Sequence, residues 1–289
     1  MIRLCAFSDE ASPSLQGQID AMKRNGIALT ELRSVAGKNV KDLTLAQAAE
    51  IKAALNEAGI AVWSIGSPLG KVDISVDIGE YLHTVAHVCE LAQALGCKRI
   101  RMFSFFGAYG QPEKVYDYLK RMTEVANGYG VMLCHENEKD IFGDTLERVQ
   151  LIRRNVPGLA HVYDPANFLQ CGQAAEQTLA ALHAGTEYFH IKDVIAATGE
   201  IVPAGHGDGH IGELIAMLDP DADVVLTLEP HLRVFAGYAQ IDSVEMKNKY
   251  TYENNDQAFD AATDALKVLL AQNGYKQDAG GFVKDASRA

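Results

Sequence analysis

Short apolar runs alternate with amphipathic stretches along most of the chain. The runs are rich in β-branched and aromatic residues and have the length of buried strands. We expect strands at residues 2–8, 28–33, 60–66, 98–105, 131–137, 158–164, 187–193 and 223–230. The stretches between them have helical spacing, most clearly where Leu82, Val85, Cys89, Ala92 and Leu95 follow one another at steps of three or four residues.

Glycine follows the end of several predicted helices, where a left-handed helix terminus favours this residue. These glycines are Gly26, Gly59, Gly96, Gly130, Gly158 and Gly185. Eight strand–helix units in a chain of 289 residues predict an α/β protein, a single-domain (β/α)8 TIM barrel. A doubly wound sheet is the alternative, but it usually has fewer strands and a glycine-rich first turn. The first turn here, residues 8–13, reads SDEASP.

We expect the barrel to occupy residues 1–273. Two segments are longer than a minimal barrel requires. Residues 231–255 form a long connection between the last strand and the last helix, and we expect a lid or an oligomer arm there. Residues 274–289 are polar and contain glycine, so we expect a loosely held C-terminal extension.

The composition narrows the function classes. With 26 basic and 38 acidic residues the formal net charge is −12, which disfavours a nucleic acid partner. Asp9 and Glu10 interrupt the segment that a signal peptide would need, and no apolar window has the length of a membrane helix. The five cysteines are scattered, without a CxxC pair, and are typical of reduced thiols. We therefore expect a cytoplasmic protein that binds neither membrane nor nucleic acid.

Four consecutive predicted strands carry a carboxylate or imidazole at their C-terminal ends, the rim where barrels hold their active sites. Taken singly, each could be a helix cap or a hydrogen-bonded core group. Buried together, like charges repel unless a cation compensates them. We predict one divalent metal ion bound by Glu136, Asp164, His190 and Glu229. Three oxygens and one imidazole suit Mn²⁺, Mg²⁺, Co²⁺ or Zn²⁺, and the residue types do not choose among them.

Three neighbouring residues are candidates for substrate binding. Lys192 shares a strand face with His190 and is a partner of a ligand carboxylate, a contact to the substrate, or a surface lysine at the strand end. Arg33, which shares a strand face with Glu31, could bind a carboxylate or phosphate of the substrate, or it could form a structural ion pair within the barrel. His231 follows Glu229 by two residues and could orient the site.

The loop at residues 203–210, with sequence PAGHGDGH, opens the seventh helix. Barrels often bind phosphate with backbone N–H groups at this place. However, Asp208 would oppose a phosphate, and a tight glycine turn capped by Asp208 is the alternative. A zinc motif of the HExxH type is excluded at His135 and Glu136, because Lys139 stands where the second histidine would be.

Short motifs follow one another in the order of the predicted strands and loops. They are Glu31-Leu32-Arg33, Gly66-Ser67-Pro68, Glu136-Asn137, Asp164 with Asn167, His190-Ile191-Lys192-Asp193, Pro203-Ala204-Gly205 with Gly207-Asp208-Gly209, and Glu229-Pro230-His231. In this order they resemble the xylose-isomerase-like barrel superfamily, the sugar phosphate isomerase/epimerase group, over about residues 1–273.

This resemblance implies an enzyme that isomerises or epimerises a small sugar, sugar phosphate or keto acid. The glutamates corresponding to Glu136 and Glu229 bind the metal in that group and face opposite sides of the substrate. One removes a proton beside a carbonyl that the cation polarises, and an enediolate follows. The resemblance adds Ser67 and Asn167 to the candidate substrate ligands, and it implies a homo-oligomer, a dimer or a tetramer.

Three other functions remain as alternatives. A keto-inositol or keto-sugar dehydratase would need only one added acid, such as His231 or Lys192. An apurinic endonuclease-like hydrolase is suggested by Asp208-Gly209-His210, but histidines are missing from the ends of the third and fourth strands. A non-catalytic ligand-binding barrel would be favoured by a degraded ligand set, and nothing in this set looks degraded.

Overall fold

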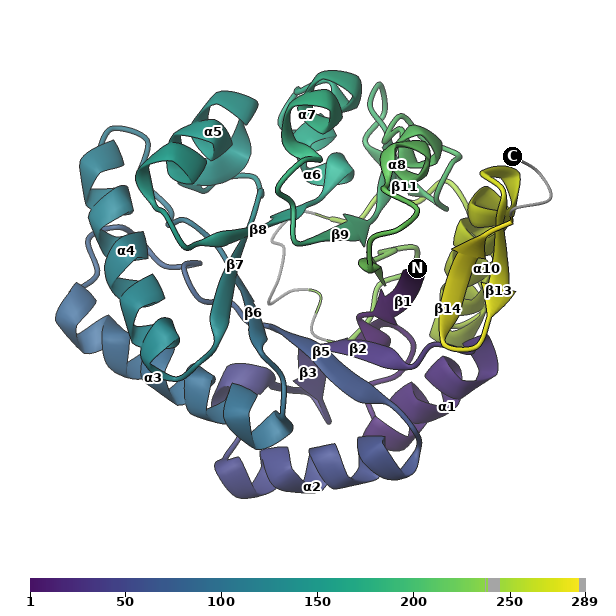
Figure 1. Ribbon diagram of the computed structural model, residues 1–289, viewed down its shortest axis with the longest axis horizontal. Coiled ribbons are helices and arrows are strands. Elements are labelled where there is room, and N and C mark those ends of the chain that lie inside the picture. Colours follow the sequence, from purple (N-terminus) through teal and green to yellow (C-terminus); the bar gives the residue numbers. More distant parts are fainter. Residues whose placement is uncertain (237, 239–244, 286–289) are drawn as a thin grey trace.

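A closed barrel of eight parallel strands forms the centre of the computed structural model, which describes residues 1–236, 238 and 245–285. Strand β12 pairs with β1 and closes the barrel (Figure 1). The barrel strands are β1 (Ile2–Ala6), β2 (Leu29–Leu32), β5 (Ala61–Gly66), β6 (Arg99–Met102), β7 (Met132–Glu136), β8 (Ala160–Tyr163), β9 (Tyr188–Ile191) and β12 (Val224–Leu228). All eight expected strands and the (β/α)8 fold are confirmed.

Helices surround the barrel and cover its outer face (Figure 1). They are α1 (Leu15–Asn25), α2 (Leu45–Glu57), α3 (Ile78–Leu95), α4 (Pro112–Gly128), α5 (Leu146–Asn155), α6 (Pro165–Gln170), α7 (Ala175–Leu182), α8 (Ile211–Met217) and α10 (Asn255–Gln272). The apolar face predicted around Val85 lies on α3, which ends at Gly96 with a φ of 76°, as the glycine pattern predicts. No helix among the described residues has the length and apolarity of a membrane span.

Short elements lie in the loops between the barrel strands and helices. They are the strands β3 (Ser34–Val35), β4 (Lys38–Asn39), β10 (Asp193–Ile195) and β11 (Glu200–Val202), and the 3₁₀ helices η1 (Ser8–Glu10), η2 (Val40–Asp42) and η3 (Phe142–Asp144).

Side chains inside the barrel form an apolar layer and a charged layer. The apolar layer contains Cys134 on β7 and Tyr188 on β9. Because side chains on a strand alternate between its two faces, Glu136 and His190 point into the barrel two residues further along. The charged layer therefore lies at the C-terminal ends of the strands, on an apolar floor.

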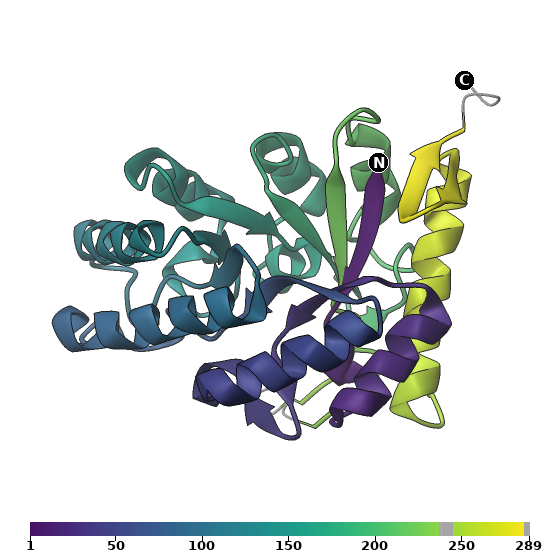
Figure 2. The same ribbon diagram turned by 60° about the horizontal axis from the view of Figure 1, so that its bottom comes forward.

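The C-terminal extension forms a hairpin of β13 (Tyr275–Asp278) and β14 (Gly281–Lys284), which differs from the expected loose segment. Phe282 pairs with Ile2 at the start of β1. Tyr275 and Phe282 are 4% and 7% exposed, so two aromatic side chains hold the hairpin in place. Figure 2 shows it beside α10, at the end of the barrel where β1 begins.

The long connection after β12 places aromatic side chains beside the charged end of the barrel. Strand β12 ends at Leu228 and α10 begins at Asn255, as expected. Phe235 and Tyr238 are buried against His231. Residues 237 and 239–244 of this connection lie outside the described residues, and its role as a lid or an oligomer arm stays a prediction.

Candidate metal centre and active site

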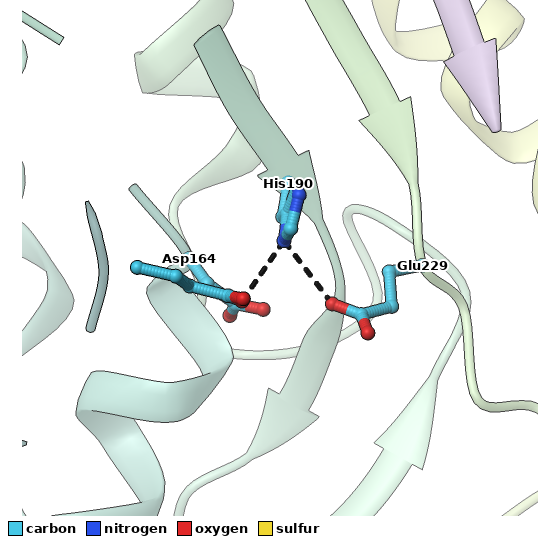
Figure 3. Close-up of side chains that lie close together, drawn as sticks. Asp164, His190 and Glu229 are labelled. Atoms are coloured by element: carbon cyan, nitrogen blue, oxygen red, sulfur yellow. Dashed lines mark hydrogen bonds and ion pairs between the residues drawn. The ribbon is translucent and has the colours of Figure 1, made fainter. Parts of the chain in front are cut away.

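The four residues predicted as metal ligands lie together at the C-terminal ends of β7, β8, β9 and β12. Each offers an atom within 4.8 Å of the atoms from the other three, and none is more than 3% exposed. The Nδ1 atom of His190 is 2.9 Å from Glu136 Oε1 and 3.2 Å from Glu229 Oε2. Figure 3 shows the side chains of Asp164 and Glu229 directed toward the His190 ring.

Local structure fixes Asp164 at the rim. It is the N-cap of α6, where its Oδ1 accepts the backbone N–H of Asn167 at 2.9 Å. The side chain of Asn137, just beyond β7, accepts the Asp164 backbone N–H and donates to the Asp164 carbonyl. These bonds tie the ends of two adjacent strands, and they leave Asp164 Oδ2 directed toward the cluster.

Three permanent cations lie beside the carboxylates of this cluster. Arg101 Nε is 3.1 Å from Glu136 Oε2, Lys192 Nζ is 2.9 Å from Asp164 Oδ2, and Arg33 Nη1 is 3.1 Å from Glu229 Oε1. The buried carboxyl groups around them number six: Asp9, Glu10, Glu31, Glu136, Asp164 and Glu229. Carboxyl groups therefore outnumber the permanent cations even when Glu10 is protonated, which favours an additional cation.

The hydrogen bonding of two carboxylate oxygens in the cluster indicates whether it fits a metal ion. Asp164 Oδ2 and Glu229 Oε2 lie within ion-pair distance of Lys192 and His190, respectively. Yet, among the described residues, neither oxygen meets the geometry of a hydrogen bond. Buried carboxylate oxygens are otherwise almost always bonded. Two incompletely satisfied oxygens beside an imidazole nitrogen therefore fit a divalent metal ion.

The environment moves the pKa values of the ligand groups in different directions. Burial raises the pKa of Asp164 to about 7, although Lys192 opposes the shift. Burial also acts to raise the pKa of Glu229, but Lys192 and His190 outweigh it and hold this pKa well below its usual value. One carboxyl group therefore titrates near neutrality while another stays ionised, a pattern typical of acid–base sites.

Arg33 lies in a buried ion-pair network. Its guanidinium bonds both carboxylate oxygens of Asp9, at 3.0 and 2.9 Å, and contacts Glu10 at 3.2 Å. The rings of Phe7 and Phe235 lie 4.4 and 4.7 Å from it. The structure thus shows Arg33 in an ion pair within the barrel, while its contact with substrate stays a prediction.

His231 lies against the same network. Its backbone N–H donates to Glu10 Oε2 at 2.8 Å, and its Nε2 is 3.6 Å from Glu229 Oε1. Burial holds its pKa well below the usual value, so the ring is neutral. Glu10, Glu229 and His231 form a second group with metal-ligand spacing. Because Arg33 already bridges Glu10 and Glu229, this second group fits a metal ion less well.

The remaining candidate substrate ligands have different surroundings. Asn167 donates to Glu136 Oε1 at 3.3 Å, and Lys192 contacts Asp164, so both lie beside candidate ligand residues. The Ser67 hydroxyl instead donates to the Arg101 carbonyl at 2.6 Å and helps to join the end of β5 to β6. The proposed contacts of all three with substrate stay predictions.

The glycine-rich loop surrounds a carboxylate of the chain itself. Asp193 accepts the backbone N–H groups of Gly205, Gly207 and Gly209 as well as that of Val194. These are the N–H groups that a phosphate would need. Asp208 accepts the N–H of Ala196, and His210, not Asp208, is the N-cap of α8. The expected glycine turn is present, but Asp208 does not cap the helix.

Sequence reasoning missed Arg101 and Glu10 as members of the site. Arg101 was detectable, because a basic residue in the middle of a buried barrel strand needs an acidic partner. Glu10 had no comparable signal. Its neighbours Arg33 and His231 come from distant parts of the chain, so its burial follows only from the closed barrel.

Solved structures with this fold include several enzymes. The chain is 17% identical to the IOLI protein with a binding zinc atom (TM-score 0.70, covering 94% of this chain and 99% of that one). It is 15% identical to L-ribulose 3-epimerase (TM-score 0.71; 94% and 96%). It is 16% identical to the probable 3-DHS dehydratase AsbF, involved in petrobactin synthesis, from Bacillus anthracis (TM-score 0.70; 92% and 99%).

Sequence comparison with curated proteins found no match. Residues 19–267, most of the chain, match the family described as the xylose isomerase-like TIM barrel. The closed eight-stranded barrel agrees with that match. The chain therefore belongs to the xylose isomerase-like TIM barrel family.

Proposed function

We propose that the protein is a divalent-metal-dependent isomerase or epimerase of a small sugar, sugar phosphate or keto acid. The observation that carries this proposal is the arc of four buried ligand residues, with Glu136 and Glu229 at its two ends and Asp164 and His190 between them. Two carboxylates are thereby available on different sides of one site. This is the arrangement that proton removal and return on two faces of a carbon atom requires.

Glu136, Asp164, His190 and Glu229 would hold the ion. A divalent ion in this place supplies a Lewis acid that acidifies the C–H group beside a carbonyl. Glu229 is ionised, so its carboxylate can accept this proton. If Glu136 enters this step protonated, return of its proton to the opposite face gives the epimer, and Glu229 then releases the abstracted proton to solvent. Return of the abstracted proton by Glu229 to the adjacent carbon instead gives the aldose–ketose isomer. Lys192 and Arg101 offer positive charge where the enediolate develops.

A dehydratase is the second candidate function. The protonation state of Glu10 favours it. Burial raises the pKa of Glu10 to about 8, so this carboxyl group carries a proton at neutral pH. It lies 3.4 Å from His231, beside Glu229. After proton removal, a neutral acid in this place could protonate a departing hydroxyl group. AsbF, a probable 3-DHS dehydratase, has the same fold.

The test uses Mn²⁺-saturated protein and a panel of ketoses, aldoses, their phosphates and keto acids in D₂O. We expect deuterium to enter the carbon beside the carbonyl, detected by NMR, with loss of at least about 100-fold in rate for Glu136→Gln and Glu229→Gln. Glu187→Gln is the matched control, because this glutamate pairs with Arg99 at the opposite end of the barrel. Loss of one water from the product would assign the dehydratase. Wild-type exchange rates in either Gln variant would refute the assigned roles.

A further inference from the structure

Glu31 is a fully buried carboxylate that lies outside the group of four metal ligands. It is on β2 and is 0% exposed. Its Oε2 is 3.1 Å from His190 Nε2, and its Oε1 accepts the Tyr188 hydroxyl at 2.9 Å. One oxygen therefore contacts a ligand residue, and the other is fixed by a neighbour.

The two ring nitrogens of His190 face different partners. Nδ1 faces the ligand carboxylates of Glu136 and Glu229, whereas Nε2 faces Glu31. A neutral imidazole carries one N–H group and one lone pair, and only the lone pair can bind a metal. The two carboxylates beside Nδ1 attract the N–H to that nitrogen, where it would block metal binding. A hydrogen-bond acceptor beside Nε2 is therefore needed to keep the N–H on that nitrogen.

We propose that Glu31 is a positioning residue that accepts the Nε2–H of His190 and so directs the Nδ1 lone pair toward Glu136, Asp164 and Glu229. This inference rests on the metal site of the proposed function. Carboxylate partners of this kind orient metal-bound histidines in many proteins and increase the basicity of the ligand nitrogen.

Glu31 is itself held in place by a chain of buried groups. The hydroxyls of Tyr188 and Ser64 are 3.2 Å apart. The pairing of β2 with β5 shifts here, from Thr30 with Val62 to Glu31 with Ser64, so that Trp63 has no partner on β2. A bulge of this kind redirects neighbouring side chains. As a result both Ser64 and the Trp63 ring, 6.3 Å from the Tyr188 ring between centroids, contact the tyrosine that fixes Glu31.

Aromatic rings also limit the movement of the imidazole. The ring centroids of Phe7 and Tyr188 lie 5.2 and 5.6 Å from that of His190, both in edge-on contact. These contacts confine the plane of the ring, but they do not decide which nitrogen carries the proton. In this environment Glu31 supplies the acceptor at Nε2.

The test compares the Mn²⁺ and Zn²⁺ affinities of variants by calorimetry at one pH. We expect Glu31→Ala to weaken binding about 10- to 100-fold, as is typical for the loss of such a partner. Glu31→Gln should weaken it less, because the glutamine oxygen can still accept the Nε2–H. Ser64→Ala is the matched control. It removes a buried hydroxyl of the same chain of groups but spares the contact between Glu31 and His190, and we expect a change of less than about twofold.

A spectroscopic measurement separates positioning from a general loss of packing. In zinc-loaded protein with ¹⁵N-labelled histidine, we expect His190 to carry its proton on Nε2 and the metal on Nδ1, with assignment by a His190→Gln variant. Glu31→Ala should lose this fixed arrangement while its circular dichroism spectrum stays native.

The outcomes distinguish the two proposals. If folded Glu31→Ala binds metal as tightly as the wild type, or keeps the Nε2–H form unchanged, the role of Glu31 is wrong and the metal site stands. If the wild type binds neither metal, the proposed function fails, and this inference fails with it.

Discussion

Asp193 is the residue whose replacement should reveal how the loop after β9 is held. Its Oδ1 accepts the backbone N–H groups of Val194 and Gly209, at 2.9 and 2.8 Å. Its Oδ2 accepts those of Gly205 and Gly207, at 2.8 and 3.1 Å. In Asp193→Asn one oxygen remains, and the new NH₂ group faces two N–H donors that it cannot bond.

The expected cost follows from these two lost bonds. A donor left without a partner costs about 1–3 kcal/mol when it is buried. Gly205 is exposed, so water can satisfy part of the loss. We expect Asp193→Asn to lower the free energy of unfolding by roughly 2–4 kcal/mol, measured by urea denaturation. The loop also fits closely around this side chain, because a Cβ atom on Gly207 would lie 2.4 Å from Asp193 Oδ1.

Asp208→Asn is the control in the same loop. Asp208 is exposed, and its Oδ2 accepts one N–H group, from Ala196. We expect a loss below about 1 kcal/mol for this variant. If Asp193→Asn costs no more than Asp208→Asn, the loop is not organised by the Asp193 carboxylate, and its N–H groups are available to a phosphate after all.

Two further predictions concern metal binding and the hairpin. Metal affinity should rise with pH, because protons compete for Asp164, whose pKa is about 7, and for His190, whose pKa Glu136 and Glu31 raise despite burial. Calorimetry should show about two protons released per ion below pH 7 and about one above it, and affinity independent of pH would contradict the ligand assignment. Deletion of residues 275–289 should lower the free energy of unfolding by roughly 3–6 kcal/mol, since it removes buried Tyr275 and Phe282. Metal affinity should change less than about twofold, and an unchanged urea midpoint would refute this role of the hairpin.

The barrel was predictable because its signals are local. Each strand is a short apolar run, and the helix before the next strand ends at a glycine such as Gly26 or Gly96, both with positive φ. The grouping of the four candidate ligand residues was predictable as well. Parallel strands end on one rim, so Glu136 and Glu229 had to lie close in space although they are far apart in the sequence.

Other features depend on contacts that no local pattern encodes. From the sequence, Arg33 could bind the substrate or form an ion pair. Only the structure shows that Asp9 and Glu10 lie beside it and form the ion pair. The polar segment after Gly274 suggested a loose end, but Phe282 finds a partner at Ile2. In both cases the deciding neighbour lies far away in the sequence.

The central claim is that the four-strand cluster holds one divalent metal ion. The most direct test is elemental mass spectrometry of protein purified without chelator or affinity metal, followed by soaking with Mn²⁺ or Zn²⁺ and desalting. We predict close to one divalent ion per chain, lost in a variant that combines Asp164→Asn with His190→Gln. A wild-type protein that carries no metal after soaking, or a double variant that retains a full equivalent, would contradict the claim.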